Sequence, residues 1–350
     1  MKTAMFYGGP DVRVEEVPMP EPGPDEVLVR VRAAGICGSD LHGYRAPRPG
    51  ASYPTRAGHE LSGEIAALGP GVTGLRVGQR VGIEPMHLLG CGTCRQCQRG
   101  DYHICPTRGQ RNGRRLHSAG FSEYDIVAAR NVFPLPDHVS LEEAAILDVY
   151  GVAVHGVHRL PVQPWHHVAI IGTGAVGLTQ GQVARALGAK QVIVIGTRAA
   201  PLEVARACGA ADAVVNAGAV DPVQAVLDLT GGAGADVVFE TVGGRAPTIQ
   251  QACAMAAYGG TVGVVGLFVE PAAIDTSVAM RKELEIRWVN SYSTWEGVRE
   301  FQIALDLLAA GRVRAAPLIT HRVPLDRIAE GFAWANDKRS SAAIKVLVIP

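Results

Sequence analysis

The first 145 residues carry short runs in which apolar and polar positions alternate. Residues 27–32 read Val-Leu-Val-Arg-Val-Arg, the alternation expected of a half-buried strand. The runs 63–69 and 77–81 are also apolar and are bounded by glycine. We therefore predict β structure over residues 1–35, a proline-rich connection within it at 18–24, and mainly short strands and loops as far as residue 145.

The pattern changes near Ser140, where Ser140-Leu141-Glu142-Glu143 has the form of a capping box that begins a helix. Beyond it, continuously apolar runs alternate with helical ones. Continuous apolar strands separated by helices indicate a parallel sheet covered on both faces. The predicted strands are 168–171, 191–195, 235–239 and 260–265; the predicted helices are 175–187, 201–208, 222–229 and 248–256, with a helix at 298–310 and a strand at 343–349 ending the chain.

Length and charge narrow the class of protein. A chain of 350 residues is too long for one ordinary core, so we expect two domains. The 33 basic and 33 acidic side chains balance, which argues against nucleic acid or an anionic membrane as partner. No apolar run reaches the roughly 18 residues that span a bilayer, and residues 1–9 lack the apolar core of a signal peptide. We therefore expect a cytoplasmic protein.

Four of the seven cysteines lie within fifteen residues, as Cys91, Cys94, Cys97 and Cys105. Without an export signal, such a cluster favours metal binding over disulfides. Four thiolates form a closed tetrahedral zinc site, which is structural rather than catalytic. An iron–sulfur cluster is the alternative, because it also uses four cysteines.

A dinucleotide-binding turn is predicted where the strand 168–171 ends. Gly172, Gly174 and Gly177 form Gly-x-Gly-x-x-Gly between this strand and a helix that begins at Ala175-Val176. This context is the one the fingerprint requires, with the pyrophosphate at the helix N-terminus.

The end of the next strand bears on the choice of cofactor. An acidic residue there favours NAD, but the strand ends in Gly196-Thr197-Arg198. Arg198 is placed to meet a 2′-phosphate, with Thr197 as a hydrogen-bond donor. We predict NADP, with NAD as the alternative if Arg198 is only a solvated loop arginine.

Two stretches combine residues that bind metals. Residues 35–42 contain Cys37, Asp40 and His42, and Gly58-His59-Glu60 follows shortly after. A thiol, an imidazole and carboxylates suit a zinc ion that does chemistry, provided another ligand comes from elsewhere.

The order of these motifs resembles one known family. The pattern Gly58-His59-Glu60-x2-Gly63-x5-Gly69-x2-Val72, the cysteine cluster and the glycine turn are similar to those of zinc-dependent medium-chain alcohol dehydrogenases. The resemblance spans essentially the whole chain, and is strongest to the polyol, threonine and secondary-alcohol branch. It implies an α/β protein: a GroES-like, β-rich catalytic domain (1–149 and 290–350, with a structural-zinc lobe at 88–106) and a doubly wound Rossmann domain with a parallel sheet (150–289).

The resemblance also implies a catalytic zinc site. Cys37 and His59 match the first two ligands, and Asp148 matches the third. Glu60 matches a carboxylate that binds the metal directly or through water and exchanges with substrate. Asp40 matches a nearby acid that orients a ligating imidazole.

Other roles follow from the same resemblance. Ser39 matches the hydroxyl that contacts the bound alcohol, and His42 matches the outer end of a proton relay. Val242, Gly266 and Leu267 lie in loops that line the nicotinamide half of the cofactor.

The family implies an enzyme with two zinc ions per chain that transfers a hydride between a secondary alcohol and a nicotinamide cofactor. Its partners are a small-molecule alcohol or ketone and further copies of the chain, as a homodimer or homotetramer. The alternatives are a zinc-free quinone or enoyl reductase and a non-enzymatic dinucleotide-binding sensor. The pocket-forming loops are expected at 43–57, 84–90, 107–120 and 290–296. One of them is rich in arginine, which indicates either an anionic or polyhydroxylated substrate or, as the favoured interpretation, a solvated basic loop or a subunit contact: Arg108, Arg111, Arg114 and Arg115. The aromatic residues Tyr44, Tyr292 and Trp295 either line the pocket or serve in packing.

Overall fold

The computed structural model describes the chain except for residues 48–49, 51, 86–89 and 108–118. The chain forms two compact units. Unit 1 consists of Met1–Asp148, Glu296–Leu305 and Ile319–Pro350, and unit 2 consists of Val149–Trp295 and Asp306–Leu318. Two segments expected in the catalytic domain, 290–295 and Asp306–Leu318, therefore pack with unit 2.

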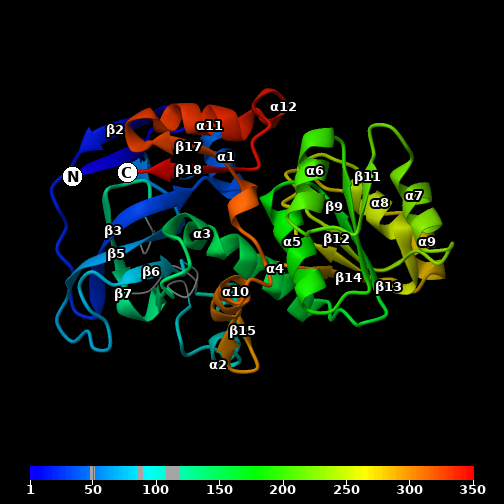
Figure 1. Cartoon of the computed structure of the whole chain (residues 1–350), viewed down its shortest axis with the longest axis horizontal. Coiled ribbons are helices and arrows are strands. Elements are labelled where there is room, and N and C mark those ends of the chain that lie inside the picture. The colour runs from blue at the N-terminus through cyan, green and yellow to red at the C-terminus, as the bar shows by residue number, and fades with distance from the viewer. Residues whose placement is uncertain (48–49, 51, 86–89, 108–118) are drawn as a thin grey trace. The chain divides into compact units, whose positions relative to one another are not determined.

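Unit 1 is built around a seven-stranded sheet in the order β17-β18-β3-β5-β6-β8, with β7 paired to β3 (Figure 1). The long strand β3 is its centre, since it pairs antiparallel with β5, β7 and β18. The strands are β3 (Glu26–Gly35), β5 (Glu60–Leu68), β6 (Arg80–Ile83), β7 (Tyr124–Ala128), β8 (Val132–Pro134), β17 (Ile319–Pro324) and β18 (Lys345–Ile349); a smaller sheet joins β1 (Lys2–Phe6), β2 (Val12–Glu16) and β4 (Thr55–Arg56).

Short helices accompany this sheet, and two of the four boundaries between the units fall inside the longer helices α4 and α10. The helices are α1 (Gly38–Arg45), α2 (Arg95–Gln98), α3 (Leu141–Ala145), α4 (Leu147–Arg159), α10 (Glu300–Ala309), α11 (Ile328–Asn336) and α12 (Lys338–Ser341). The predicted capping box at α3 is confirmed: the Glu143 amide donates to Ser140 Oγ at 3.2 Å.

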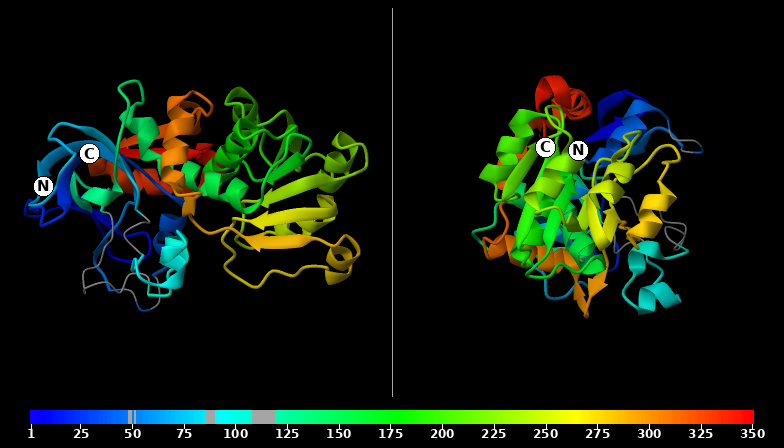
Figure 2. Two further views of the ribbon diagram at one scale, coloured as in Figure 1. Left: turned by 90° about the horizontal axis from the view of Figure 1, so that it is seen from below. Right: turned by 90° about the vertical axis from the view of Figure 1, so that its right-hand side faces the viewer.

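Unit 2 holds a six-stranded sheet in the order β11-β10-β9-β12-β13-β14, with all pairs parallel. Counted along the chain this is the order 3-2-1-4-5-6, so the doubly wound fold is confirmed and its switch point lies between β9 and β12. Helices lie on both faces of the sheet (Figure 2, right). The elements are β9 (His167–Ile171), α5 (Ala175–Ala186), β10 (Gln191–Gly196), α6 (Ala199–Ala207), β11 (Ala213–Asn216), α7 (Pro222–Leu229), β12 (Ala235–Glu240), α8 (Thr248–Met255), β13 (Ala256–Val264), α9 (Thr276–Arg281) and β14 (Glu285–Trp288), beside a small pair β15 (Thr294–Trp295) and β16 (Val298–Arg299).

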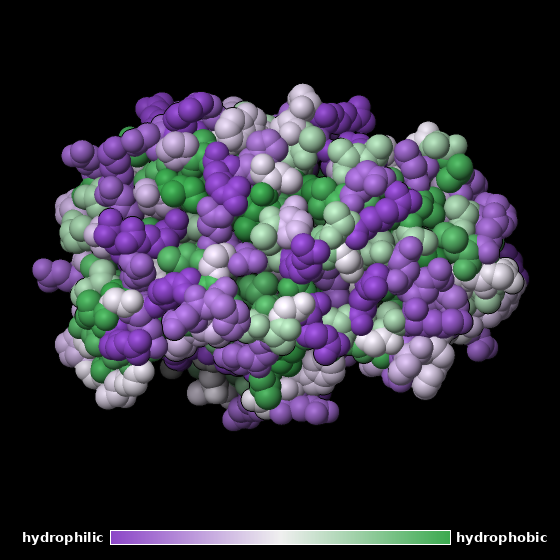
Figure 3. Space-filling view, viewed as in Figure 1, coloured by the Kyte–Doolittle hydropathy of each residue, from purple (hydrophilic) through white to green (hydrophobic). Residues whose placement is uncertain are grey.

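Each unit has a core of its own. The core of unit 1 gathers strand residues such as Val29 and Ile65 with helix residues such as Phe332. In unit 2, residues of the central strands, for example Ile193, are fully buried against α7 and α8. On the face shown in Figure 3, hydrophobic residues are scattered among hydrophilic ones. None of the helices in the described ranges is long and apolar enough to cross a membrane.

One buried carboxylate in unit 1 makes stability depend on pH. Asp125 on β7 is 3% exposed and accepts a hydrogen bond from the Ala119 amide at 2.7 Å. Burial raises the pKa of Asp125 to about 7, against the opposing effects of this hydrogen bond and of the Arg56 charge. Between about pH 4, where the unfolded side chain ionises, and pH 7, the folded state binds the extra proton, so stability falls as pH rises.

Asp125→Asn is expected to remove this dependence. The loss in free energy of unfolding between pH 5 and pH 8 should shrink by about 3 kcal/mol, since each pKa unit corresponds to roughly 1.4 kcal/mol. Urea unfolding at pH 5 and at pH 8 measures the free energy of unfolding of each variant. Asp11→Asn is the matched control, because Asp11 is exposed and pairs with Arg13. Equal pH slopes for the wild type and Asp125→Asn would contradict the prediction.

Candidate functional site

The first candidate metal group combines Cys37, His59 and Glu60 in unit 1. Cys37 is the N-cap of α1, and Glu60 is the first residue of β5, directly after His59. One ligand atom from each lies within 4.8 Å of the others. The antiparallel pairing of β3 with β5 sets this geometry, because Gly35 at the end of β3 is the register partner of Glu60.

Two aspartates complete the surroundings of His59. Nε2 lies 4.0 Å from Asp148 Oδ2, and Nδ1 lies 3.6 Å from Asp40 Oδ1. Asp40 also accepts a hydrogen bond from the Cys37 amide at 2.9 Å, so one carboxylate adjoins both Cys37 and His59. Donors bound to one zinc ion at about 2.0–2.3 Å stand roughly 3.3–3.8 Å apart. The donors present, one sulfur, one imidazole nitrogen and carboxylate oxygens, therefore fit a catalytic zinc ion.

The side chain of Glu60 faces a partner that the sequence analysis missed. Lys345 Nζ, on the last strand β18, donates to both Glu60 oxygens at 2.7 and 2.6 Å. Lys345 is 3% exposed and Glu60 is fully buried. A single lysine inside the apolar run 343–349 was the available signal, because a fully buried lysine is almost always paired.

The electrostatics of this region favour positive charge. Desolvation lowers the pKa of His59, but Asp40 and Cys37 outweigh it, so that the pKa is raised well above its ordinary value. Burial likewise lowers the pKa of Lys345, and Glu60, Cys37 and Asp148 reverse the effect. The negative potential that protonates His59 is the potential that attracts a divalent cation.

Ser39 and His42 lie on helix α1, where we expected a loop. Positions three apart on a helix share a face, so α1 places the two side chains as neighbours. Ser39 is exposed and His42 is half-buried. The hydroxyl of Ser39 and the imidazole of His42 therefore lie near each other on α1, the helix that Cys37 caps.

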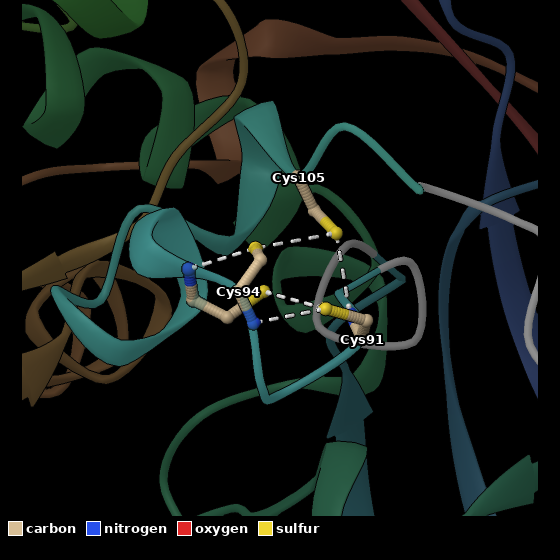
Figure 4. A group of neighbouring side chains, drawn as sticks. Cys91, Cys94 and Cys105 are labelled. Carbon is tan, nitrogen blue, oxygen red and sulfur yellow. Dashed lines mark hydrogen bonds between the residues drawn. The ribbon is translucent and has the colours of Figure 1, made fainter.

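The four clustered cysteines form the second candidate metal group. Cys91, Cys94 and Cys105 turn their sulfur atoms toward one another (Figure 4). The Cys91–Cys97 and Cys94–Cys105 sulfur distances are 4.0 and 3.8 Å. Four thiolates around one zinc ion at about 2.3 Å stand roughly 3.8 Å apart. The cluster therefore fits a single structural ion, whereas a cluster of several irons needs more widely separated thiolates.

Hydrogen bonds prepare one of these thiols for metal binding. The Thr93 hydroxyl and amide donate to Cys91 Sγ at 3.5 Å, and the Cys94 amide donates at 3.3 Å. They lower the pKa of Cys91 to about 5, so it is a thiolate at neutral pH. The predicted lobe 88–106 is described from Gly90 onward.

The glycine turn of unit 2 has the geometry of a dinucleotide site. Gly172 adopts a φ of +122°, and a Cβ on Gly177 would lie 2.0 Å from the Gly172 carbonyl oxygen. A Cβ on Gly174 would meet nothing within 4 Å, so the backbone is open to a ligand there. Gly174 is the N-cap of α5, with Ala175 and Val176 in its first turn, where free amides attract a pyrophosphate.

The predicted adenosine end of this site follows β10. Gly196 ends the strand, and a Cβ there would lie 2.4 Å from Thr173 Cγ2, so glycine keeps the turns close together. Thr197 is exposed, and Arg198 is the half-buried N-cap of α6. The basic residue thus occupies the position where NAD-binding proteins use an acid.

The predicted nicotinamide residues lie after β12 and β13, with Val242 48% and Leu267 62% exposed beside Gly266. Glu240, which the sequence analysis did not single out, braces this region. It accepts hydrogen bonds from the Val242 and Gly243 amides at 2.8 and 2.9 Å, and from the Thr248 hydroxyl at 2.8 Å. Glu240 therefore holds the start of the loop after β12 by hydrogen bonds, and the apolar side chains of Val242 and Leu267 are exposed.

The aromatic residues considered for the pocket mostly pack internally. Tyr44 contacts Phe332 with ring centroids 5.1 Å apart, and Tyr292 is fully buried. Trp295 stacks on His158 at 4.7 Å. The basic residues Arg108, Arg111, Arg114 and Arg115 lie outside the described residues.

Comparison with known proteins agrees with both units. The alcohol dehydrogenase GroES-like domain matches residues 23–137, and the zinc-binding dehydrogenase family matches residues 175–310. Sorbitol dehydrogenase of Bacillus subtilis is 33% identical over 100% of this chain and 97% of its own length. L-threonine 3-dehydrogenase of the same organism is 36% identical over 96% of this chain and 94% of its own.

Solved structures carry the same fold with cofactors bound. An alcohol dehydrogenase of Escherichia coli CFT073 complexed with NADH superimposes with a TM-score of 0.88 at 28% identity, covering 100% of this chain and 99% of that one. A zinc-binding dehydrogenase of Sinorhizobium meliloti 1021 bound to NADP gives a TM-score of 0.87 at 31% identity, with the same coverage.

A GroES-like unit with metal-capable groups and a Rossmann unit with an open glycine turn define an oxidoreductase of the alcohol dehydrogenase class. The chain belongs to the zinc-dependent medium-chain alcohol dehydrogenase superfamily. The family predicted from the motifs is confirmed.

Proposed function

We propose that the protein is a zinc-dependent dehydrogenase of secondary alcohols, with polyols, amino alcohols or threonine-like compounds as substrates and NADP as cofactor. The observation that carries the proposal is the Cys37, His59 and Asp148 donor set. Cys37 follows strand β3 and His59 directly precedes its antiparallel partner β5, while Asp148 lies at the start of α4. Relatives named for sorbitol and for threonine support this substrate class.

The roles of the residues follow from their chemistry. When bound, zinc lowers the pKa of an alcohol hydroxyl as a Lewis acid, and the nicotinamide accepts a hydride. Cys37, His59 and Asp148 would hold the metal, with Glu60 beside them. Ser39 would accept the hydroxyl proton while its own hydroxyl proton moves on toward His42, and the His42 imidazole would then release a proton to solvent. Asp40 orients His59 through Nδ1. In the cysteine lobe, Cys91, Cys94, Cys97 and Cys105 hold the structural zinc.

Two other functions are weaker. A zinc-free quinone or enoyl reductase has no use for four convergent cysteines or for the Cys37 group. A dinucleotide-binding sensor has no use for a hydroxyl and an imidazole aligned beside metal ligands. In the four-cysteine cluster and in the Cys37, His59 and Glu60 group, the ligand atoms all lie within 4.8 Å of one another.

A screen of sugar alcohols, diols and amino alcohols with NADP and NAD, joined to metal analysis, tests the function. We expect two zinc ions per chain and oxidation of at least one secondary alcohol. One zinc ion or none, or a protein that reduces quinones and oxidises no alcohol, would contradict it.

The NADP preference depends on Arg198. Arg198→Asp is expected to lower the ratio of kcat/KM for NADP over NAD by roughly ten- to a hundredfold, the effect of losing charge-assisted hydrogen bonds and introducing repulsion. Arg206→Asp, on the exposed side of α6 where it pairs with Glu203, is the matched control. An unchanged ratio would show that Arg198 is a solvated arginine.

We propose a homo-oligomer formed through the edge of the unit 2 sheet. β14 is the last strand of that sheet, and Trp288 on it is 68% exposed. A strand edge with an exposed aromatic residue is a template for pairing with a second copy. Sedimentation of the wild type and of Trp288→Glu measures the oligomeric state of each. A monomeric wild type would refute the proposed homo-oligomer.

A further inference from the structure

Lys345 is a charged residue in a strand that is otherwise apolar. Its neighbours Val346, Leu347 and Val348 are 0–1% exposed, as core residues of the unit 1 sheet. Its ammonium group contacts both oxygens of Glu60 and, at 3.3 Å, the Ile36 carbonyl. All of these lie in unit 1, and 285 residues of sequence separate the ion pair. A buried charge is tolerated only where it is paired and hydrogen-bonded. The ion pair with Glu60 is therefore what allows Lys345 to lie in this core.

The backbone makes room for the pair at Gly35. A Cβ on Gly35 would lie 2.1 Å from Glu60 Oε2, closer than any nonbonded contact allows. Glycine at this position therefore lets the carboxylate rest against β3, on the Lys345 side. Glu60 is also near Cys37 and His59, with ligand atoms within 4.8 Å. The carboxylate thus stands between two cationic partners, the ammonium group and the proposed metal.

We propose that Lys345 is a positioning residue that holds Glu60 out of the ligand shell of the catalytic metal, so that Cys37, His59 and Asp148 are the resting ligands. The inference rests on the proposed zinc-dependent function and goes beyond it. Lys345, on the last strand of the chain, would thereby keep one coordination position of the metal open for the substrate hydroxyl.

Charge balance favours this arrangement. A thiolate and one carboxylate neutralise a divalent cation, while Lys345 and Glu60 neutralise each other. Transfer of Glu60 to the metal gives the metal shell a net negative charge and leaves a buried ammonium group unpaired. Breaking a buried ion pair in this way is strongly unfavourable. A more negative shell would also weaken the stabilisation of a developing alkoxide.

Lys345→Met tests the inference, since it removes the charge and keeps a similar volume. Glu60 should then turn to the metal. We expect zinc release from the Cys37 group to a chelator to slow by about tenfold, within the range found for groups around metal ligands. The visible spectrum of Co²⁺ loaded selectively into this site should change, because it reports the number and type of donors. Lys345→Arg should restore both signals, and Lys282→Met, which removes a lysine that contacts carbonyls in unit 2, is the matched control.

Two further variants separate the mechanism from a loss of structure. Lys345→Met with Glu60→Gln removes both charges and should return the cobalt spectrum and zinc release to those of the wild type. Gly35→Ala keeps Lys345 but displaces Glu60 sterically, and should shift the spectrum in the same direction as Lys345→Met. An unchanged spectrum in Lys345→Met, or in Gly35→Ala if Lys345→Met does not fold, overturns the inference. A shift that Glu60→Gln does not reverse overturns it as well.

Failure of the proposed zinc-dependent function gives a different experimental result from failure of the role proposed for Lys345. In that case wild-type protein holds no metal at the Cys37 group, and no variant can alter its release. A wild type that binds two zinc ions and oxidises alcohols, with a Lys345→Met variant of identical spectrum, refutes only the role of Lys345.

Discussion

Cys37→Ser is expected to abolish alcohol oxidation and to reduce the zinc content from two ions per chain to one. A serine hydroxyl stays protonated at neutral pH and is a poor zinc ligand, so His59 and Asp148 alone would hold the metal weakly. The loss of the Lewis acid should lower kcat/KM by at least about a thousandfold, the scale of removing a main electrostatic contribution. Cys37 lies in unit 1 and the glycine turn lies in unit 2, so the Kd for the dinucleotide should stay within about twofold of the wild type, less than 0.5 kcal/mol.

Metal analysis, steady-state kinetics and cofactor fluorescence measure these three effects separately. Cys208→Ser is the matched control, because Cys208 is a buried thiol of unit 2 whose Sγ contacts the Ala205 carbonyl at 3.6 Å. The control should keep two zinc ions and full activity. Undiminished turnover in Cys37→Ser would refute the assignment of the catalytic ligands.

Gly174→Ala and Gly177→Ala are expected to impair cofactor binding for two different physical reasons. A Cβ on Gly174 meets no protein atom, so the variant should fold with a stability within about 0.5 kcal/mol of the wild type. The methyl group occupies the space of a pyrophosphate, and affinity for the dinucleotide should fall by roughly ten- to a hundredfold, or about 1.4–2.8 kcal/mol. A Cβ on Gly177 meets the Gly172 carbonyl at 2.0 Å, a backbone contact that no side-chain rotation relieves.

Gly177→Ala should therefore separate α5 from β9 and destabilise unit 2 by about 1–3 kcal/mol, as overpacking does. Thermal unfolding and dinucleotide titration of both variants distinguish the two effects. Wild-type affinity in Gly174→Ala would show that no phosphate approaches this turn. Wild-type stability in Gly177→Ala would show that the close approach of Gly172 and Gly177 is not needed.

Long, periodic elements were predictable from local pattern. The strands of the parallel sheet at β9, β10, β12 and β13 and the helix α5 agree with the expected ranges, since a strand buried on both faces must be continuously apolar. The strands β11, β14 and β17 were not predicted. β14 alternates Glu285-Ile286-Arg287-Trp288 and is largely exposed at an edge, so it carries no apolar run.

The helix α1 was also missed, because Gly38-Ser39-Asp40 reads locally as a loop. Asp40 contacts the Cys37 amide and lies near His59, and these contacts give the segment its order. Of the candidate metal site, the group Cys37, His59 and Glu60 was visible in the motifs. Asp148 was identified only through the family resemblance, and its 4.0 Å approach to His59 is a product of the fold.

The sequence by itself determined the four-cysteine cluster and the glycine turn, because each depends on residues within some fifteen positions of one another. Chain length, the change of pattern near Ser140 and the order of these motifs along the chain indicated the two-domain α/β organisation and the family. Spacing and periodicity act locally and can be read directly. Only the tertiary structure decided that Glu60 rests on Lys345, that Asp148 faces His59 and that Glu240 braces the loop beside Val242. The antiparallel pairings of β3 with β5 and β18 bring Lys345, near the end of the chain, against Glu60, and only this pairing of distant segments gives the buried carboxylate its partner.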